Sequence, residues 1–456
     1  MKESNAFCNF SIQLLFFGLC LFVAGCSCLK LGETCSSNNE CEAGLRCEAC
    51  PANGNTRARC IRTRPLSPTS KVKGLAFNKY SWLTTHNSFA LINSKSQTGT
   101  ILLSPSNQED TVTSQLNNGV RGIMLDVYDF NNDIWLCHSF GGNCFNYTAY
   151  QPAINVLKEI EAFLAANPSE IVTIFIEDYV LYPQGLTKIF DASGLKKYWF
   201  PVSKMPKDGE DWPTLDDMVQ NNQRLVVFTS KADKEISEGI AYTWKYVVEN
   251  QYGDSGMKAG SCPNRVESLP MSSKRVSLVV LNYFPAIPNV TESCFENSAP
   301  LIGMTKSCYE AAGQRWPNFI SVDFYQRSDG GGALQALDEV NGQLTCGCAN
   351  IAYCRENAPR GTCDVPQIAP PPPAADANAH PQPSSHNASD TNIPYLHVNQ
   401  SQVQWIVGTI MSIAPPPGAA QHSPPPSSNI AYFDAKPIQL QWLLGTILIV
   451  MPLFWL

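Results

Sequence analysis

The chain has no run of basic residues. Its Lys and Arg number 32 against 39 Asp and Glu, which gives a formal net charge of −7. Clustered positive charge is what attracts nucleic acids and anionic lipid surfaces. The sequence therefore argues against nucleic acid as a partner and against electrostatic docking on anionic lipid.

Histidine is also scarce. The chain has six, and four of them fall in a Pro/Ser-rich C-terminal stretch: His380, His386, His397 and His422. The part that we expect to fold has two, His86 and His138, and each comes just after a short apolar run. Both are therefore candidates for a site at the ends of strands.

The central part of the sequence has no G-x-G-x-x-G motif after an apolar run, which weakens a dinucleotide-binding fold. What it has is an alternation of strand-like and helix-like segments. The strand-like runs span residues 81–86, 120–128, 134–139, 170–178, 224–230, 276–284 and 318–325. Residues 151–168 predict a helix with Leu157, Ile160 and Leu164 on one face.

Nearly continuous apolar strands that alternate with helices are typical of a parallel sheet covered on both faces. Repeated over about 250 residues, they favour a closed α/β barrel of the TIM type over an open doubly wound sheet. We place this barrel at residues 72–363. Barrel active sites lie at the carboxyl ends of strands. Seven polar residues fall there and are expected to line one pocket: His86, Asp126, His138, Glu177, Asp178, Lys231 and Asp323.

The N-terminus has the pattern of a secretory signal peptide. An uncharged apolar stretch follows Lys2, and Val23 and Gly25 are small residues suited to cleavage before Cys26. Removal of residues 1–25 leaves sixteen of the 18 cysteines, an even number that predicts disulfides in a secreted chain. Four N-glycosylation sequons fit the same exterior, at Asn146, Asn289, Asn387 and Asn399.

Residues 26–66 are rich in cysteine and poor in apolar residues. Seven cysteines fall between Cys26 and Cys60. A segment with so small a core needs covalent cross-links, and we predict a small disulfide module in front of the barrel. The C-x₂-C spacing of Cys47 and Cys50 leaves zinc as an alternative.

The C-terminal part is expected to be an extended Pro/Ser-rich stalk over residues 366–429. An apolar tail follows over residues 430–456, with no charge after Lys436. Small residues, a spacer and an apolar tail are typical of a glycosylphosphatidylinositol (GPI) attachment signal, and a short tail-anchor helix is the alternative. Candidate attachment sites are Ser427, Ser428 and Asn429. We therefore predict a secreted protein held by a GPI anchor at the extracellular face of the plasma membrane.

Two histidines at the mouth of one barrel suit the cleavage of a phosphodiester. One imidazole takes a proton from the attacking hydroxyl, and the other protonates the leaving alkoxide. Histidine is the side chain whose ordinary pKa permits both tasks near neutral pH. The alternative is that either histidine is a structural residue of the core or rim.

Four stretches carry a resemblance to a known family: THNSF, GVRGIMLDVYDF, WLCHSF and VTIFIEDY. In this order they resemble the catalytic X region of phosphatidylinositol-specific phospholipase C, a PLC-like phosphodiesterase family. The sequence is most similar to plant extracellular X-domain-containing proteins, which share the Cys-rich start and the GPI-type tail. With characterised phospholipases the resemblance covers mainly residues 75–235.

The resemblance implies roles for particular positions. His86 matches the histidine that acts as base on the inositol 2-hydroxyl, and His138 matches the general acid toward the diacylglycerol oxygen. Asp323 resembles a late-strand aspartate that orients the first histidine in the bacterial enzymes. Lys231 resembles a lysine that contacts the inositol headgroup, and Arg121, in the R-G-I-x-L-D run, is assigned to substrate binding.

The resemblance also implies a metal site. Asn87, Asp126 and Glu177 match positions that hold calcium in the eukaryotic enzymes. Those enzymes have an acidic residue where this chain has Met124, and the metal-independent bacterial enzymes have an arginine where it has Asp126. The three residues are a candidate Ca²⁺ site whose shell water would complete. The alternative is that Asp126 and Glu177 are hydrogen-bonded rim carboxylates.

These observations predict a phosphoric diester hydrolase of the phospholipase C type that acts on a membrane lipid or a glycerophosphodiester. We also expect a disulfide between Cys137 and Cys144, which would fix the loop that carries His138. Two alternatives are kept. One is a cell-surface binding module whose catalysis is impaired by Met124, and the other is a glycerophosphodiester phosphodiesterase. The sequence does not identify protein partners.

Overall fold

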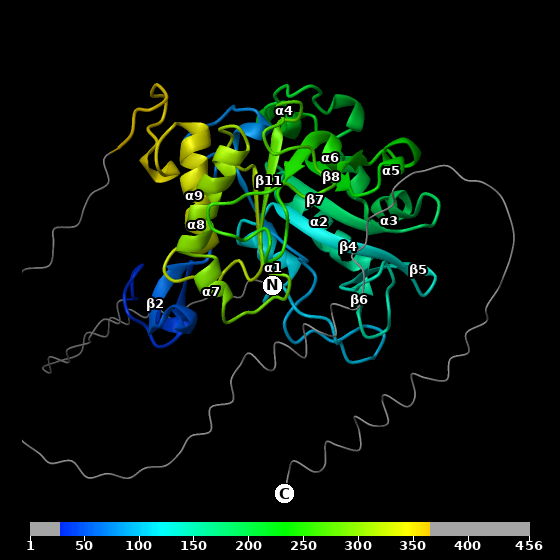
Figure 1. Cartoon of the computed structure of the whole chain (residues 1–456), viewed down its shortest axis with the longest axis horizontal. Coiled ribbons are helices and arrows are strands. Elements are labelled where there is room, and N and C mark those ends of the chain that lie inside the picture. Colours follow the sequence, from blue (N-terminus) through cyan, green and yellow to red (C-terminus); the bar gives the residue numbers. More distant parts are fainter. Residues whose placement is uncertain (1–27, 365–456) are drawn as a thin grey trace, which may run out of the picture. The chain divides into compact units, whose positions relative to one another are not determined.

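The computed structural model describes residues 28–364 (Figure 1). The predicted signal peptide, stalk and anchor signal lie outside the described residues. So do five of the predicted modification sites: Asn387, Asn399, Ser427, Ser428 and Asn429.

A parallel sheet of eight strands forms the centre of the described chain (Figure 1). Its hydrogen-bonded order is β10-β11-β12-β3-β4-β7-β8-β9, and each neighbouring pair is parallel. Helices alternate with the strands along the chain, so the predicted α/β barrel is confirmed. The strands are β3 Trp82–Thr85, β4 Gly122–Phe130, β7 Val172–Tyr179, β8 Leu225–Thr229, β9 Ala241–Tyr242, β10 Val247–Glu249, β11 Leu278–Tyr283 and β12 Phe319–Val322.

The barrel is open at one seam. In the part of the chain that the structure describes, no ladder joins β9 to β10, which α6 separates. The helices are α1 Val112–Asn117, α2 Ala153–Ala166, α3 Gly185–Ser193, α4 Leu215–Gln220, α5 Asp233–Ser237, α6 Thr243–Tyr246, α7 Ser293–Glu296, α8 Ala299–Ala311 and α9 Gly332–Thr345. The apolar face predicted for α2 is buried, with Leu157 2% exposed and both Ile160 and Leu164 fully buried. No helix among residues 28–364 is long and apolar enough to cross a membrane.

The third predicted barrel strand is wrong. Residues 134–139 fall largely in β5 (Asp133–Cys137), which pairs antiparallel with β4 and then with β6 (Ala149–Pro152). Only Asn131 and Asn132 connect β4 to β5, and both have positive φ, 52° and 59°. A two-residue turn of this kind closes a hairpin, whereas a parallel neighbour needs a long crossover. His138 therefore lies on a hairpin beside the barrel.

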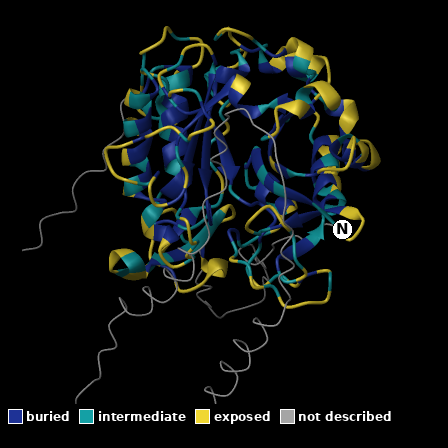
Figure 2. Ribbon diagram, turned by 45° about the vertical axis from the view of Figure 1, so that its right-hand side comes forward, coloured by how far each residue is buried: buried dark blue, intermediate teal, exposed yellow. Residues whose placement is uncertain are grey.

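Apolar side chains fill both the inside and the outside of the sheet. Figure 2 shows the strands as the most buried part, with exposed residues on the surrounding helices and loops. Inside the barrel, the ring of Phe175 lies 5.2 Å from that of Phe228 and 5.0 Å from that of Phe319. The Gly of the R-G-I run allows β3 and β4 to approach, because a Cβ at Gly122 would lie 2.1 Å from Oγ1 of Thr84.

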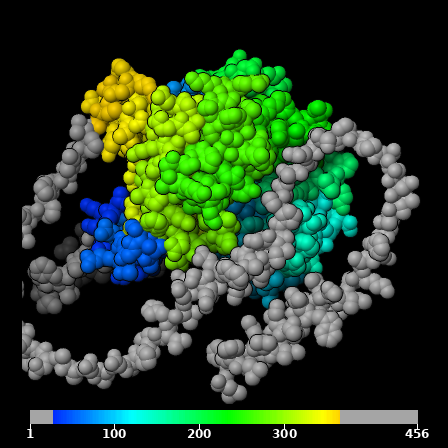
Figure 3. Space-filling model, in the orientation of Figure 1, coloured from blue at the N-terminus to red at the C-terminus, as the bar shows by residue number. Residues whose placement is uncertain are grey.

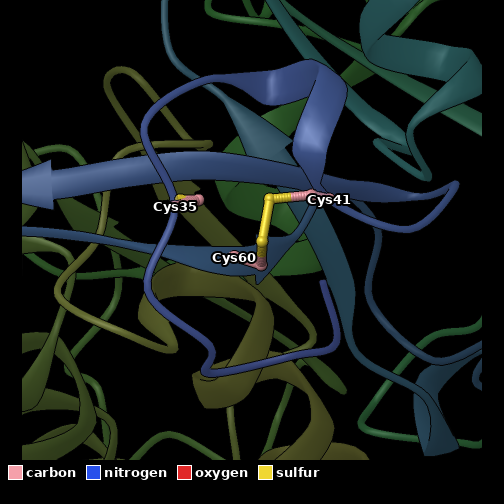
Figure 4. Close-up of side chains that lie close together, drawn as sticks. All are labelled: Cys35, Cys41 and Cys60. Atoms are coloured by element: carbon pink, nitrogen blue, oxygen red, sulfur yellow. A yellow bond between two sulfur atoms is a disulfide. The ribbon is translucent and has the colours of Figure 1, made fainter. Parts of the chain in front are cut away.

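The N-terminal module is a two-stranded antiparallel sheet of β1 (Leu45–Cys50) and β2 (Asn55–Arg62). Disulfides join Cys35 to Cys47 and Cys41 to Cys60, and Figure 4 shows Cys35 beside the latter pair. Cys50 is bonded to Cys294 of α7 in the barrel. Because these sulfurs are in disulfides, the disulfide prediction is confirmed and the zinc alternative for Cys47 and Cys50 is wrong.

Further disulfides stabilise the barrel. They join Cys137 to Cys144 as predicted, and also Cys262 to Cys308, Cys346 to Cys354, and Cys348 to Cys363. The sequon residues Asn146 and Asn289 are both exposed, so their glycosylation stays a prediction that the structure permits sterically.

Candidate active site

A cavity of about 280 Å³ lies at the carboxyl ends of the barrel strands. Four of the predicted polar residues line it: His86, Asp126, His138 and Glu177. Asn87 and Met124 line it as well, together with Trp244, Glu249, Tyr252, Arg265, Asn282 and Phe284. The cavity therefore brings together residues from seven of the eight barrel strands or the loops that follow them, all except β12.

His86 directly follows β3 and is fixed on several sides. Its backbone N–H donates to the carbonyl of Val322 in β12 at 3.1 Å. Its Nδ1 lies 2.9 Å from Oδ1 of Asp323, and its ring stacks on that of Phe284 with centroids 3.6 Å apart. This arrangement leaves Nε2 as the nitrogen available for proton transfer.

Asp323 lies behind His86, with 2% of its surface exposed. The Asn107 amide donates to its Oδ1 at 2.9 Å, while its Oδ2 has no hydrogen-bond partner among the described residues. Burial raises the pKa of Asp323, and the neighbouring His86 opposes that rise. Asn87 and Phe324, which follow His86 and Asp323, have φ of 39° and 45°. Such backbone strain is concentrated at functional sites.

His138 comes from the β5–β6 hairpin. Its Nδ1 lies 2.9 Å from the carbonyl oxygen of Pro105, which can only accept, so Nδ1 carries the hydrogen and Nε2 is free. Burial lowers the pKa of His138 to about 4, and the nearby His86 adds to the effect. His138 is therefore neutral at pH 7 in the free protein, and a bound anion would raise its pKa.

Asp126 and Glu177 are register partners on the parallel strands β4 and β7. Burial and then the negative charge of Glu177 raise the pKa of Asp126 well above its usual range. The Asn87 amide, with its nitrogen turned to Asp126, donates to both carboxylate oxygens at 3.0 and 3.2 Å. The Tyr179 hydroxyl donates to Glu177.

These residues fit a divalent cation in chemical type. Burial is the main cause of the raised pKa of Asp126, and repulsion between the two adjacent carboxylates adds to it; a cation between them would relieve that repulsion. The Asn87 amide could then turn its oxygen toward the ion. Met124, two residues before Asp126 on the same face, adds no charge because its thioether is neutral. Its sulfur accepts a hydrogen bond from the Ser321 hydroxyl at 3.1 Å.

The sequence did not reveal a positively charged side chain that lines the cavity, Arg265. Its guanidinium lies 4.9 Å from the ring centroids of both Trp244 and Tyr252 and 3.3 Å from Oε1 of Glu249. Glu249, at the end of β10, also accepts from Trp244 Nε1 at 2.8 Å and from Asn282 Nδ2 at 2.7 Å. Arg265 was missed because it lies in a long loop without a strand-end pattern.

Three predicted residues lie elsewhere. Arg121 precedes β4, pairs with Glu170 at 2.8 Å and lines a different cavity of about 410 Å³, so its assignment to substrate binding is corrected. Asp178 points away from Glu177 and accepts from the Thr229 hydroxyl, as the alternation of a strand requires. Lys231 is exposed and does not line the cavity. Its ammonium lies 5.9 Å from the Tyr179 ring centroid.

The comparisons with known proteins, together with the α/β barrel, support the class of a phospholipase C-like phosphodiesterase. The family model described as PI-PLC X 1 matches residues 78–341. A PI-PLC X domain-containing protein of Arabidopsis thaliana is 57% identical over 334 residues, which are 73% of this chain and 78% of that protein. The chain belongs to the PI-PLC X domain family.

More distant similarities accompany this match. An uncharacterized secreted protein of Arthroderma benhamiae is 24% identical over 257 residues, 52% of this chain and 56% of that protein. The solved phosphatidylinositol-specific phospholipase C from Listeria monocytogenes covers 60% of this chain and 95% of its own, with 15% identity and a TM-score of 0.40.

Proposed function

We propose that the protein cleaves the phosphodiester of an inositol-type membrane lipid by attack of a hydroxyl of its own headgroup. The products are a cyclic phosphodiester and a lipid alcohol such as diacylglycerol. The observation that carries the proposal is that His86 and His138 line the same cavity. In each, Nδ1 is hydrogen-bonded, to Asp323 and to the Pro105 carbonyl respectively, and Nε2 is available for proton transfer.

The two histidines take different roles because their surroundings differ. His86 accepts the hydroxyl proton at Nε2, and Asp323 stabilises the imidazolium that forms. His138 gives a proton to the leaving oxygen. It must be charged to do so, and the phosphate anion provides the interaction that raises its low pKa.

Two sets of residues in the cavity are suited to bind the substrate, one at the charged phosphate and one at the headgroup. Asn87, Asp126 and Glu177 would hold Ca²⁺, which when bound would neutralise charge on the phosphate oxygens. Arg265 presents a fixed positive charge on the same cavity, and Glu249 and Tyr252 beside it offer acceptor and stacking contacts to a polyol. In this proposal Arg265, which lines the cavity, contacts the headgroup in the role expected for Lys231.

A lipid substrate is favoured by the surface around the mouth. In the described part of the chain, ten of the eleven exposed large apolar side chains lie on segments that follow barrel strands or on the His138 hairpin. They are Ile101, Leu103, Phe140, Leu181, Tyr182, Ile236, Tyr252, Val266, Ile287 and Phe295. A water-soluble glycerophosphodiester, the second substrate class, would need no such rim.

The proposed location is the cell exterior. The many disulfides of the barrel and module require an oxidising compartment in most organisms. Secretion with a GPI anchor would keep the mouth of the barrel near lipid of the outer leaflet.

The test uses the protein as secreted, assayed with and without Ca²⁺ on phosphatidylinositol vesicles and on a soluble glycerophosphodiester. We expect release of a water-soluble phosphate product from vesicles, and its loss in His86→Ala and His138→Ala. Turnover of the soluble diester alone would favour the glycerophosphodiesterase. No turnover of either by a folded protein would favour the surface-binding module.

A further inference from the structure

We infer that the N-terminal disulfide module positions the catalytic base, with Glu48 acting through Arg327 and Glu109 on the two segments that hold His86. The kinetic part of this inference rests on the proposed function. The structural part concerns the His86–Asp323 contact alone.

Two segments of the barrel hold His86. Residues 107–110 supply Asn107, which donates to Asp323, and Gln108, whose amide donates to the carbonyl of His86 at 2.8 Å. Residues 323–329 follow β12 and begin with Asp323. The Phe324 N–H donates to the carbonyl of Asn107 at 2.8 Å, so the two segments also fix each other.

An ion-pair cluster joins both segments to the module. Arg327 pairs with Glu109 through Nε at 2.7 Å and with Glu48 of β1 through Nη1 at 2.9 Å. Arg46 of β1 holds the other Glu48 oxygen at 2.6 Å and also donates to Gln326. The Glu48 side chain is only 4% exposed, so its charge is screened little by water.

Further contacts anchor the same segments from the module side. Asn53 and Asn55 donate to the two carboxylate oxygens of Asp329 at 2.6 and 2.7 Å. The Cys50–Cys294 disulfide ties β1 to α7, and Asn297 just after α7 donates to the carbonyl of Asp323 at 2.9 Å. Figure 3 shows the module in blue against the barrel surface.

The molecule contains a matched control for a purely structural contact. Arg62 of β2 pairs with Asp338 of α9 at 2.6 Å, and Asp338 is 1% exposed. This ion pair also joins module to barrel, but it does not contact either segment that holds His86. If the module only stabilised the fold, Glu48→Gln and Arg62→Gln would have similar effects.

The test compares Glu48→Gln with Arg62→Gln in the full secreted chain. We expect Glu48→Gln to lower kcat roughly tenfold at unchanged KM and Arg62→Gln to keep kcat near wild type. In an Asp323→Asn background, Glu48→Gln should cause no further loss, because both changes act on the same contact. Additive losses, or an unchanged kcat, would overturn the inference.

A second readout does not depend on activity. We expect the proton between His86 Nδ1 and Asp323 to give a downfield proton NMR signal, and Asp323→Asn should remove it. Glu48→Gln should broaden or shift it and Arg62→Gln should leave it intact. An unchanged signal in Glu48→Gln contradicts positioning even if the protein proves inactive on every lipid. If Glu48→Gln does not fold, Glu109→Gln makes the same test from the barrel side.

Discussion

At the residue scale, His86 and His138 look alike in the sequence but have different hydrogen-bond partners in the structure. Each has Nδ1 engaged from behind, His86 by a carboxylate and His138 by the carbonyl of Pro105. A carboxylate stabilises an imidazolium far more than a neutral carbonyl does. Burial further disfavours the charged form of His138 and lowers its pKa. The two histidines therefore differ in their surroundings before substrate binds, and in the proposed mechanism His138 becomes the acid only when a bound anion charges it.

This difference predicts proton uptake when an anion binds. His138 has its pKa lowered to about 4 in the free protein, so at pH 6 it is neutral. A bound anion raises that pKa, so the His138 imidazole takes up a proton from the solvent. Calorimetry with inositol sulfate, which does not titrate near pH 6, in two buffers of different ionisation enthalpy should show uptake approaching one proton. Binding without uptake, or uptake that persists in His138→Ala, would contradict the assigned role.

Met124 gives a second prediction at this scale. Met124→Glu would place a third carboxylate beside Asp126 and Glu177, which should tighten Ca²⁺ binding roughly tenfold because affinity follows ligand charge. Without calcium the added repulsion should lower the melting temperature, and calcium should restore it. Titration calorimetry and thermal melts of wild type, Met124→Glu and the uncharged Met124→Gln test this. If calcium binds Met124→Glu and Met124→Gln equally and shifts their melting temperatures equally, Asp126 and Glu177 are not metal ligands.

At the scale of elements, the sequence predicted the barrel strands that lie in apolar runs of six or more residues, and missed the two strands that lie in no such run. The runs at 81–86, 170–178 and 318–325 are barrel strands because burial on both faces makes them continuously apolar. The strands β9 and β10 have two and three residues, too few to show a pattern. Glu249 and Arg265 belong to this region, so the site wall that they form could not be predicted.

The β5–β6 hairpin predicts a separation of stability from activity. The Cys137–Cys144 disulfide closes a short loop, with a sequence separation of 7, and its loss should cost about 2 kcal/mol of unfolding free energy. Because His138 lies inside this loop, the Cys137→Ser/Cys144→Ser variant should lose more activity than its small stability loss explains. Denaturant unfolding and the vesicle assay measure the two effects. Full activity in this variant would show that the loop needs no covalent support.

At the scale of the whole molecule, the segments that follow the barrel strands contribute the cavity lining, most of the exposed apolar side chains and Arg327, the barrel partner of Glu48. The alternation of apolar strands and helices was enough to predict the fold, and the four stretches contained five predicted site residues that line the cavity: His86, Asn87, Asp126, His138 and Glu177. The sequence could not place the module, because the Cys50–Cys294 disulfide joins residues 244 apart in sequence. Nor could it reveal the ion-pair cluster, whose members look like ordinary surface charges in the sequence.

The rim predicts a selective loss of activity on membranes. The double variant Ile101→Ser/Leu181→Ser removes side chains that are 80% and 86% exposed, on the segments that follow β3 and β7. Vesicle binding should weaken roughly tenfold, from lost apolar burial in lipid, while turnover of a soluble substrate stays unchanged. Co-sedimentation with phosphatidylinositol vesicles measures the binding. Leu31→Ser, on the module and 57% exposed, is the matched control and should bind as wild type.

The measurement that tests the central claim most directly is ³¹P NMR of the wild-type reaction with phosphatidylinositol. The account predicts that a cyclic inositol phosphodiester appears first, because an internal hydroxyl attacks, and that neither His86→Ala nor His138→Ala forms it. Direct appearance of a phosphomonoester, or a cyclic product that survives loss of either histidine, would contradict the two-histidine mechanism.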